Sequence, residues 1–250
     1  MTHALGAAAL AVIYVALFAF GLSEDWREEA LLGSETLVRG HLVVAASVVL
    51  AAIALARPVP AIAYHATLNT AVHALGRWLS IAGLAVMVGL ILLQIIMRLF
   101  FDAPNWTEEG ARFLMLWMVG LMAPIAWRQG GFVAIDMLER ALGRVTAGLL
   151  GLFLVGIALW VLIVMSDKGW NNHVDSMTGR GNSASLRLPL DLIGGERIRF
   201  QNNWQYASLF VGTCLMIIVT IELILRRVLS LFGGDDRVEP IAEAGQAGAE

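Results

Sequence analysis

Four long runs of uncharged, apolar residues constrain this chain more than any other feature of its sequence. A helix needs roughly 20 mostly apolar residues to cross a bilayer. The second run reaches that length if it is extended back through Gly110, with the Arg112 side chain snorkelling to the interface. The sequence therefore predicts an all-α integral membrane protein with a four-helix core. The runs cover residues 78–97, 113–127, 145–165 and 204–221.

Composition agrees with a membrane protein and excludes several other classes. Of the 250 residues, 58% are hydrophobic and 15% are charged, whereas soluble domains carry about 25% charged residues. The net charge of −3 shows no basic footprint for a nucleic acid. Cys214 is the single cysteine, so the chain has neither a disulfide framework nor a cysteine metal cluster.

Two further apolar runs precede the core. Residues 4–22 could form a signal peptide, but no Lys or Arg precedes the run, which favours a retained transmembrane helix. Residues 42–56 span only ~22 Å as a helix, so they form a short span or a re-entrant or tilted segment. We expect six helices in total, with five or four as alternatives. Residues 1–57 form an N-terminal extension with two predicted transmembrane helices.

Residues 58–77 show a helical polar stripe. Pro58 and Pro60 suit a helix start. The spacing predicts an amphipathic helix lying in the plane of the membrane surface, with its histidines solvated. A connector with accidental spacing is the alternative. Polar residues recur every four positions, at His65, Asn69, His73 and Arg77, opposite the apolar Tyr64, Leu68, Val72 and Leu75.

Three segments complete the predicted organisation. Residues 78–232 form the four-helix core, which includes a long loop over residues 166–203. A second short amphipathic helix is predicted over residues 132–142, ending at Gly143. The tail, residues 233–250, is rich in Gly, Ala and Glu and is predicted to be disordered.

The distribution of arginine predicts that both termini face the cytoplasm. With the N-terminus inside, the mostly acidic loop over residues 23–40 lies outside, in agreement with the positive-inside rule. The loop over residues 166–203 carries five basic residues and disagrees with that orientation. The arginines that then fall on the cytoplasmic side are Arg128, Arg140, Arg144, Arg226 and Arg227.

A charged cluster lies where the second core helix begins. Asn105 can cap that helix with Glu108 as its capping-box partner, and Glu108 can also pair with Arg112 one turn later. Local helix chemistry thus explains the cluster, and the interfacial belt explains Trp106. A compatible second interpretation is that Glu109, Arg98 and Arg112 face a partner protein. For Arg128 and Asp136 two alternatives are likewise open: contact with lipid headgroups or contact with another subunit.

The sequence contains few groups that could carry chemistry or cargo. Its five histidines do not pair at mid-membrane, which disfavours a haem-binding redox subunit. The span interiors hold almost nothing ionisable, and no internal repeat is visible, which disfavours a self-contained carrier. The local Glu222–Arg226 spacing predicts only a modest helix pair. The chain is therefore predicted to be a scaffold and not an enzyme.

The order of motifs resembles the small, Q-type membrane subunit of tripartite ATP-independent periplasmic (TRAP) transporters. The resemblance covers roughly residues 79–225, as four spans with a long loop before the last. It departs from the family pattern at Phe132, where a histidine is usual, and in the extra N-terminal helices. The residues that carry it are Arg98, Phe101, Pro104, Trp106, Glu108, Glu109, Arg112, Trp117, Gly120, Arg128, Gly130, Phe132 and Asp136.

The resemblance implies a role in the import of organic acids by a secondary, generally sodium-coupled, symport system. The large permease (M) subunit would hold the substrate and sodium sites, so that no cofactor is expected in this chain. A periplasmic substrate-binding protein would deliver the substrate, and the complex would lie in the bacterial inner membrane. The partner-interface candidates are Arg98, Trp106, Glu108, Glu109, Arg112, Trp117, Arg128 and Asp136.

Overall fold

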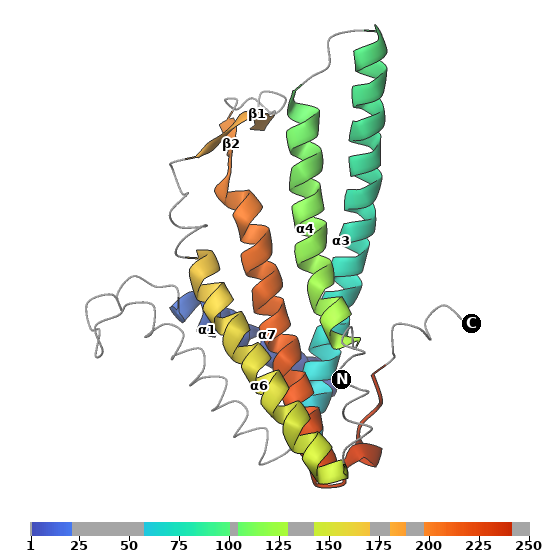
Figure 1. Ribbon diagram of the computed structural model, residues 1–250, viewed down its shortest axis with the longest axis vertical. Helices are drawn as coiled ribbons and strands as arrows, with labels where there is room; N and C mark the ends of the chain where they lie inside the picture. Colours follow the sequence, from blue (N-terminus) through green and yellow to red (C-terminus); the bar gives the residue numbers. More distant parts are fainter. Residues whose placement is uncertain are drawn as a thin grey trace, which may run out of the picture. The chain divides into compact units, whose positions relative to one another are not determined.

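The computed structural model of the protein describes residues 2–21, 58–100, 105–129, 143–170, 181–188 and 198–241 (Figure 1). Four of its helices, α3, α4, α6 and α7, are long and apolar enough to cross a membrane. The predicted all-α membrane class and the four core spans are therefore confirmed. The helices are α1 (Thr2–Gly21), α3 (Pro58–Phe100), α4 (Trp106–Arg128), α6 (Arg144–Lys168) and α7 (Asn203–Leu231).

Helix α3 corrects the prediction of a separate helix at the membrane surface. It runs without a break through residue 77, and its 43 residues give a length of about 65 Å. His65 and Asn69 are each only 3% exposed, although the sequence interpretation placed this polar face in solvent. Periodicity identified the face correctly but could not identify its neighbour, which is another part of the chain.

The long loop and the C-terminal tail differ from the sequence-based expectations. The long loop contains a two-stranded antiparallel sheet of β1 (Asn182–Leu188) and β2 (Ile198–Gln201), which the sequence analysis did not predict. The tail was predicted to be disordered, yet residues 233–241 are placed and include the short 3-10 helix η4 (Asp235–Arg237). Residues 42–56 and 132–142, with Phe132 and Asp136, lie outside the described residues.

The chain divides into two compact units. Unit 1 comprises residues 1–72, 124–167 and 214–250, and unit 2 comprises residues 73–123 and 168–213. The apolar core belongs to unit 1, where buried side chains of α1, α3, α6 and α7 form one cluster. Its members are Tyr14, Ile62, Leu162, Ile163, Ile217, Ile218, Ile221, Leu225 and Leu229.

In unit 2, small residues bring helices together. A Cβ atom on Gly76 would lie 3.4 Å from the Leu121 carbonyl oxygen, and one on Gly83 would lie 3.3 Å from Met118 Cγ. Along α3 the less exposed residues follow a heptad spacing, which is typical of two helices packed along a seam. Figure 1 shows α3 and α4 running side by side. The seam residues of α3 are Gly76, Ser80, Gly83, Met87, Leu90, Gln94 and Met97.

The closest helix contact in unit 2 joins α4 to α7. A Cβ atom on Gly212 would lie 2.6 Å from the Gly120 carbonyl oxygen and 2.9 Å from its Cα. A Cβ atom on Gly120 would likewise overlap the Ser208 carbonyl oxygen. Glycine at both positions allows the two backbones to approach directly, which is a common basis of helix association in membranes.

Glycine also ends α7. Gly233 has a φ of 76°, a conformation that favours glycine because it has no Cβ. The Gly234 N–H donates to the Leu229 carbonyl at 3.0 Å, and the Gly233 N–H donates to the Ser230 carbonyl at 3.0 Å. These are the two hydrogen bonds of a Schellman motif. The following Val238 then packs against the apolar core of unit 1.

Candidate functional site

The most constrained polar group in the described residues is the carboxylate of Glu222 on α7, which is fully buried. Its Oε2 accepts hydrogen bonds from Asn69 Nδ2 at 2.6 Å and from Arg128 Nε at 3.0 Å. Its Oε1 accepts from Arg128 Nη2 at 2.8 Å and from Arg226 Nε at 2.9 Å. Arg128 thus binds both carboxylate oxygens through the Nε–Nη2 edge of its guanidinium group, a bidentate geometry that gives strong ion pairs.

Three helices supply this cluster. Asn69 comes from α3, Arg128 is the last residue of α4, and Arg226 follows Glu222 by one turn of α7. Arg128 Nη1 also donates to Thr70 Oγ1 at 3.3 Å, which adds a second contact to α3. Next to the cluster, Trp127 Nε1 donates to Thr220 Oγ1 at 3.0 Å. The cluster therefore links α3, α4 and α7 within unit 1.

The chemistry of the cluster is that of a closed ion pair. A buried carboxylate costs several kcal/mol unless counter-charges and hydrogen bonds compensate it. A carboxylate offers about four lone-pair positions, and the four protein donors occupy that number. The arginine side chains are 13% (Arg128) and 17% (Arg226) exposed. The oxygens of Glu222 therefore offer no open position to a transported cation.

This cluster corrects two sequence interpretations. Glu222 lies inside the candidate span Asn203–Leu231, so the expectation that the spans hold no buried ionisable group is wrong. Arg128, expected to contact either headgroups or another subunit, pairs with Glu222 of its own chain. The predicted Glu222–Arg226 pair is confirmed at 2.9 Å. A single carboxylate within an apolar run was the available signal, and it was interpreted only locally.

A second carboxylate, Glu109, binds strand β1 of the two-stranded sheet, which is called the hairpin below. It accepts hydrogen bonds from the Ser183 hydroxyl, from the Ser185 N–H at 3.4 Å and from the Leu186 N–H at 3.3 Å. The Ser185 hydroxyl donates to the Asn105 carbonyl at 3.2 Å. Glu109 on the first turn of α4 therefore holds β1 against that helix.

An aromatic contact attaches the other strand. Phe200 of β2 packs edge-to-face on Phe113 of α4, with ring centroids 4.8 Å apart. Both strands are thus fixed to the beginning of α4 in unit 2. The sequence analysis did not predict this contact, because it did not predict the two strands.

The predicted pair of the neighbouring Glu108 with Arg112 is confirmed. The Glu108 carboxylate pairs with Arg112 at 3.2 Å, and the two side chains are 69% and 60% exposed. The pair lies one turn apart on the surface of α4, where such contacts contribute only a few tenths of a kcal/mol. Adjacent carboxylates therefore have different roles, because only Glu109 lies toward the hairpin.

The remaining interface candidates lie in different settings. Trp117 Nε1 donates to the Trp204 carbonyl at 3.1 Å, so its polar group is used within unit 2. Trp106 is 41% exposed, and Arg98 is also exposed. Among the predicted residues that the structure describes, the exposed ones are Arg98, Trp106, Glu108 and Arg112.

Metal binding finds no support in the part of the chain that the structure describes. No group of three or more His, Cys, Asp or Glu residues in it could hold a metal ion. His65, considered above for haem, has both ring nitrogens engaged: Nδ1 donates to the Ala61 carbonyl at 2.9 Å, and Nε2 lies 2.9 Å from the Tyr14 hydroxyl.

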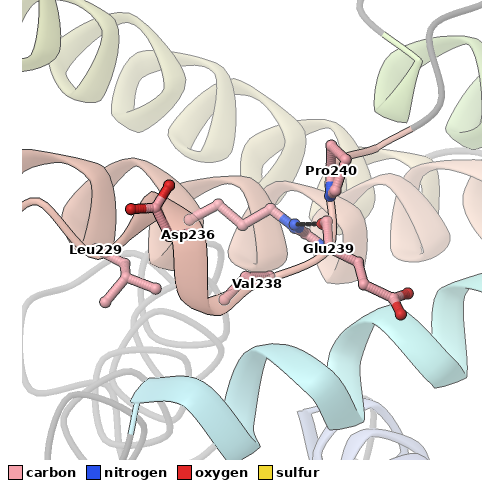
Figure 2. A pocket seen from close by; sticks show the side chains of 6 residues that line it. Leu229, Asp236, Val238, Glu239 and Pro240 are labelled. Atoms are coloured by element: carbon pink, nitrogen blue, oxygen red, sulfur yellow. Dashed lines mark hydrogen bonds between the residues drawn. The ribbon is translucent and has the colours of Figure 1, made fainter.

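A cavity of about 470 Å³ lies at the end of α7, where the chain turns back (Figure 2). Arg226 Nη1 donates to the Glu239 carbonyl at 2.7 Å, which fastens the returning segment beside the Glu222 cluster. The cavity walls carry two carboxylates, Asp236 and Glu239, as well as the arginine. Its lining residues are Arg226, Leu229, Asp236, Val238, Glu239 and Pro240.

Comparison with known families gives the context for these sites. Residues 87–230, more than half of the chain, match the family described as tripartite ATP-independent periplasmic transporters, DctQ component. The chain belongs to this family. No curated protein and no solved structure matches it. The protein is therefore a small membrane subunit of a TRAP transporter, as its motifs suggested.

The region of the TRAP small subunit that matches the family includes some residues of the two carboxylate sites and leaves others out. It contains Glu109 with its hairpin partners, and it contains Glu222 with both arginines. It does not contain Asn69, which supplies the shortest hydrogen bond to Glu222, nor helix α1. The cluster thus joins the family region to residues that precede it.

Proposed function

We propose that this TRAP small subunit is a non-catalytic scaffold that binds the large permease subunit and holds it in the bilayer. The observation that supports this most directly is the saturation of the Glu222 carboxylate by Asn69, Arg128 and Arg226. Carriers place ionisable groups where an ion or substrate can reach them. Here the buried carboxylate is used to fasten helices together.

The remaining assignments of this proposal extend the family resemblance, and the orientation of the termini extends the distribution of arginine. The transporter would import organic acids by sodium symport, with the substrate and sodium sites in the large subunit. A periplasmic binding protein would deliver the substrate. The small subunit would lie in the bacterial inner membrane with both termini in the cytoplasm.

The structure sharpens the proposed contact surface for the large permease. Glu109, Trp117 and Arg128 form hydrogen bonds within the chain, so their contribution to an interface would be indirect. The better direct contacts are the exposed candidates Arg98, Trp106, Glu108 and Arg112. Asp136 stays a candidate on its sequence position alone.

Co-purification tests the scaffold role. The tagged subunit is extracted gently from its native host, and a large multi-spanning permease is expected to accompany it. Arg98→Glu should weaken this association, while Arg237→Glu, an exposed arginine in η4, serves as the charge-matched control. Absence of any permease from the wild-type preparation would refute the proposal.

Reconstitution separates a scaffold from a carrier. Proteoliposomes with the small subunit alone should take up no organic acid, whereas the small and large subunits together with the binding protein should. Sodium-dependent uptake by the small subunit alone would show that it carries cargo itself and would end the scaffold interpretation.

A further inference from the structure

Helix α1 lies outside the region that matches the family, yet it is packed into unit 1 at two positions. A Cβ atom on Gly6 would lie 2.5 Å from Tyr64 Cε1, so α1 lies close against this ring of α3. Two turns later, the Tyr14 hydroxyl lies 2.9 Å from His65 Nε2. Tyr14 is 3% exposed, whereas Val12 and Val15 on the same helix are each 68% exposed.

The hydrogen bonds of His65 determine which atom donates to which. A carbonyl oxygen can only accept, so His65 Nδ1 carries the proton shared with the Ala61 carbonyl. In the neutral ring, Nε2 is then an acceptor, and the Tyr14 hydroxyl donates to it. His65 is 3% exposed, so water has little access to Nε2, and the Tyr14 hydroxyl supplies the hydrogen bond instead.

His65 and Asn69 lie one turn apart on α3 and form a single polar face. Polar groups that face lipid without a partner are costly because hydrocarbon offers no hydrogen bonds. Helix α7 supplies the partner of Asn69 through Glu222, and α1 supplies the partner of His65 through Tyr14. Both halves of the face therefore require a neighbouring helix.

We infer that α1 is an obligatory structural helix of this subunit, which covers the His65 side of α3 and so keeps the Asn69–Glu222 cluster closed. The inference goes beyond the proposed scaffold function, because it assigns a role to a helix that the family region does not include. It rests on that function only where assembly with the permease is concerned.

A double-mutant cycle on the purified subunit tests the inference without the permease. Tyr14→Phe removes only the hydroxyl, and His65→Leu removes the buried acceptor. Each single change should lower the melting temperature, by about 2–4 °C for each kcal/mol lost. The combined variant should lose clearly less than the sum, because it removes the buried hydroxyl donor and its ring acceptor together. Additive losses would overturn the inference.

Two matched comparisons keep the test decisive if His65→Leu fails to fold. Tyr14→Phe is compared with Val15→Ala, an exposed position on the same helix, and only Tyr14→Phe should lower the melting temperature. Gly6→Leu, which collides with Tyr64, is compared with Ala9→Leu at an exposed position. Equal behaviour within both pairs would show that α1 is dispensable.

Assembly provides the last measurement. Where wild-type subunit retains the permease, Tyr14→Phe and Gly6→Leu should reduce the retained amount, and Val15→Ala should not. Unchanged retention by destabilised variants would overturn the link between α1 and assembly. Failure of the wild type to retain the permease would instead count against the scaffold proposal, and the melting cycle would still decide the role of α1.

Discussion

The two compact units bury different kinds of residue. Among the described residues, unit 1 buries large aliphatic side chains, such as Ile62, Ile217 and Leu225. In unit 2 every described residue in the buried class is Gly, Ser or Thr. Unit 1 also holds the buried ion pair of Glu222, whereas unit 2 holds the Gly120–Gly212 approach of two backbones.

The comparison shows two ways to hold membrane helices together. Lipid is as apolar as leucine, so burying aliphatic side chains gives little preference for protein neighbours over lipid. Unit 1 adds specificity through charge and hydrogen bonds, which hydrocarbon cannot satisfy. Unit 2 adds it through backbone contact, which small residues allow and lipid chains cannot match.

The two carboxylates that fasten elements of this chain together also lie in different environments. Glu222 is fully buried and has two arginines beside it, because neutral donors would not compensate a charge removed from water. Glu109, at the end of α4, is held by hydroxyl and backbone N–H groups. Substitutions at these contacts should therefore lower the stability of the subunit by different amounts.

The largest effect is expected for Glu222→Gln. It leaves Arg128 and Arg226 without their counter-charge and replaces an acceptor with a donor, which should cost about 3–5 kcal/mol. The measurement is the melting temperature in detergent together with permease retention. Glu239→Gln is the control, since its backbone and not its side chain binds Arg226. Equal stability of the two variants would contradict the role of the cluster.

The next largest effect is expected for Gly212→Ala in unit 2. The added methyl group would lie 2.6 Å from the Gly120 carbonyl oxygen, so α4 and α7 must separate, at a cost of about 1–3 kcal/mol. At Gly89 and Gly156 an added Cβ atom would meet nothing within 4 Å among the described residues, apart from the adjacent backbone of its own helix. Gly89→Ala and Gly156→Ala should therefore be neutral or stabilising, by up to about 1 kcal/mol. Thermal melts that fail to separate these three variants would disprove the backbone contact.

A smaller and local effect is expected for Glu109→Gln. The neutral amide oxygen accepts more weakly than a carboxylate, a difference of about 1 kcal/mol for such bonds. Hydrogen exchange of β1 and β2 should accelerate, while that of α6 stays unchanged. Glu108→Gln, one residue away and 69% exposed, should leave the hairpin protected. If both variants exchange alike, Glu109 does not hold the hairpin.

The smallest effect is expected for the surface pair of Glu108 and Arg112. Both side chains are largely exposed, and the coupling between Glu108→Ala and Arg112→Ala should stay below about 0.5 kcal/mol. A double-mutant cycle in thermal melts measures it, and added salt should reduce it further. A coupling comparable to that of the Glu222 cluster would show that a partner desolvates this pair.

The spans and the local pairs could be predicted from the sequence because they depend on short-range patterns. Apolar length predicted α3, α4, α6 and α7, and spacing predicted the Glu108–Arg112 and Glu222–Arg226 pairs. The same reasoning misplaced the polar face of His65 and Asn69, because periodicity shows that a face exists and not what covers it. The hairpin had too weak a pattern to be recognised.

The sequence by itself determined that this is a membrane subunit of the TRAP family with a core of four spans, because a helix that crosses hydrocarbon must be long and apolar and the order of such runs is written in the chain. Tertiary structure decided the partners of the charges. Glu222 meets Asn69 across 153 positions and Arg128 across 94, and Glu109 meets Ser183 across 74. Such pairs arise from how helices pack against one another, and no local pattern of residues encodes that packing.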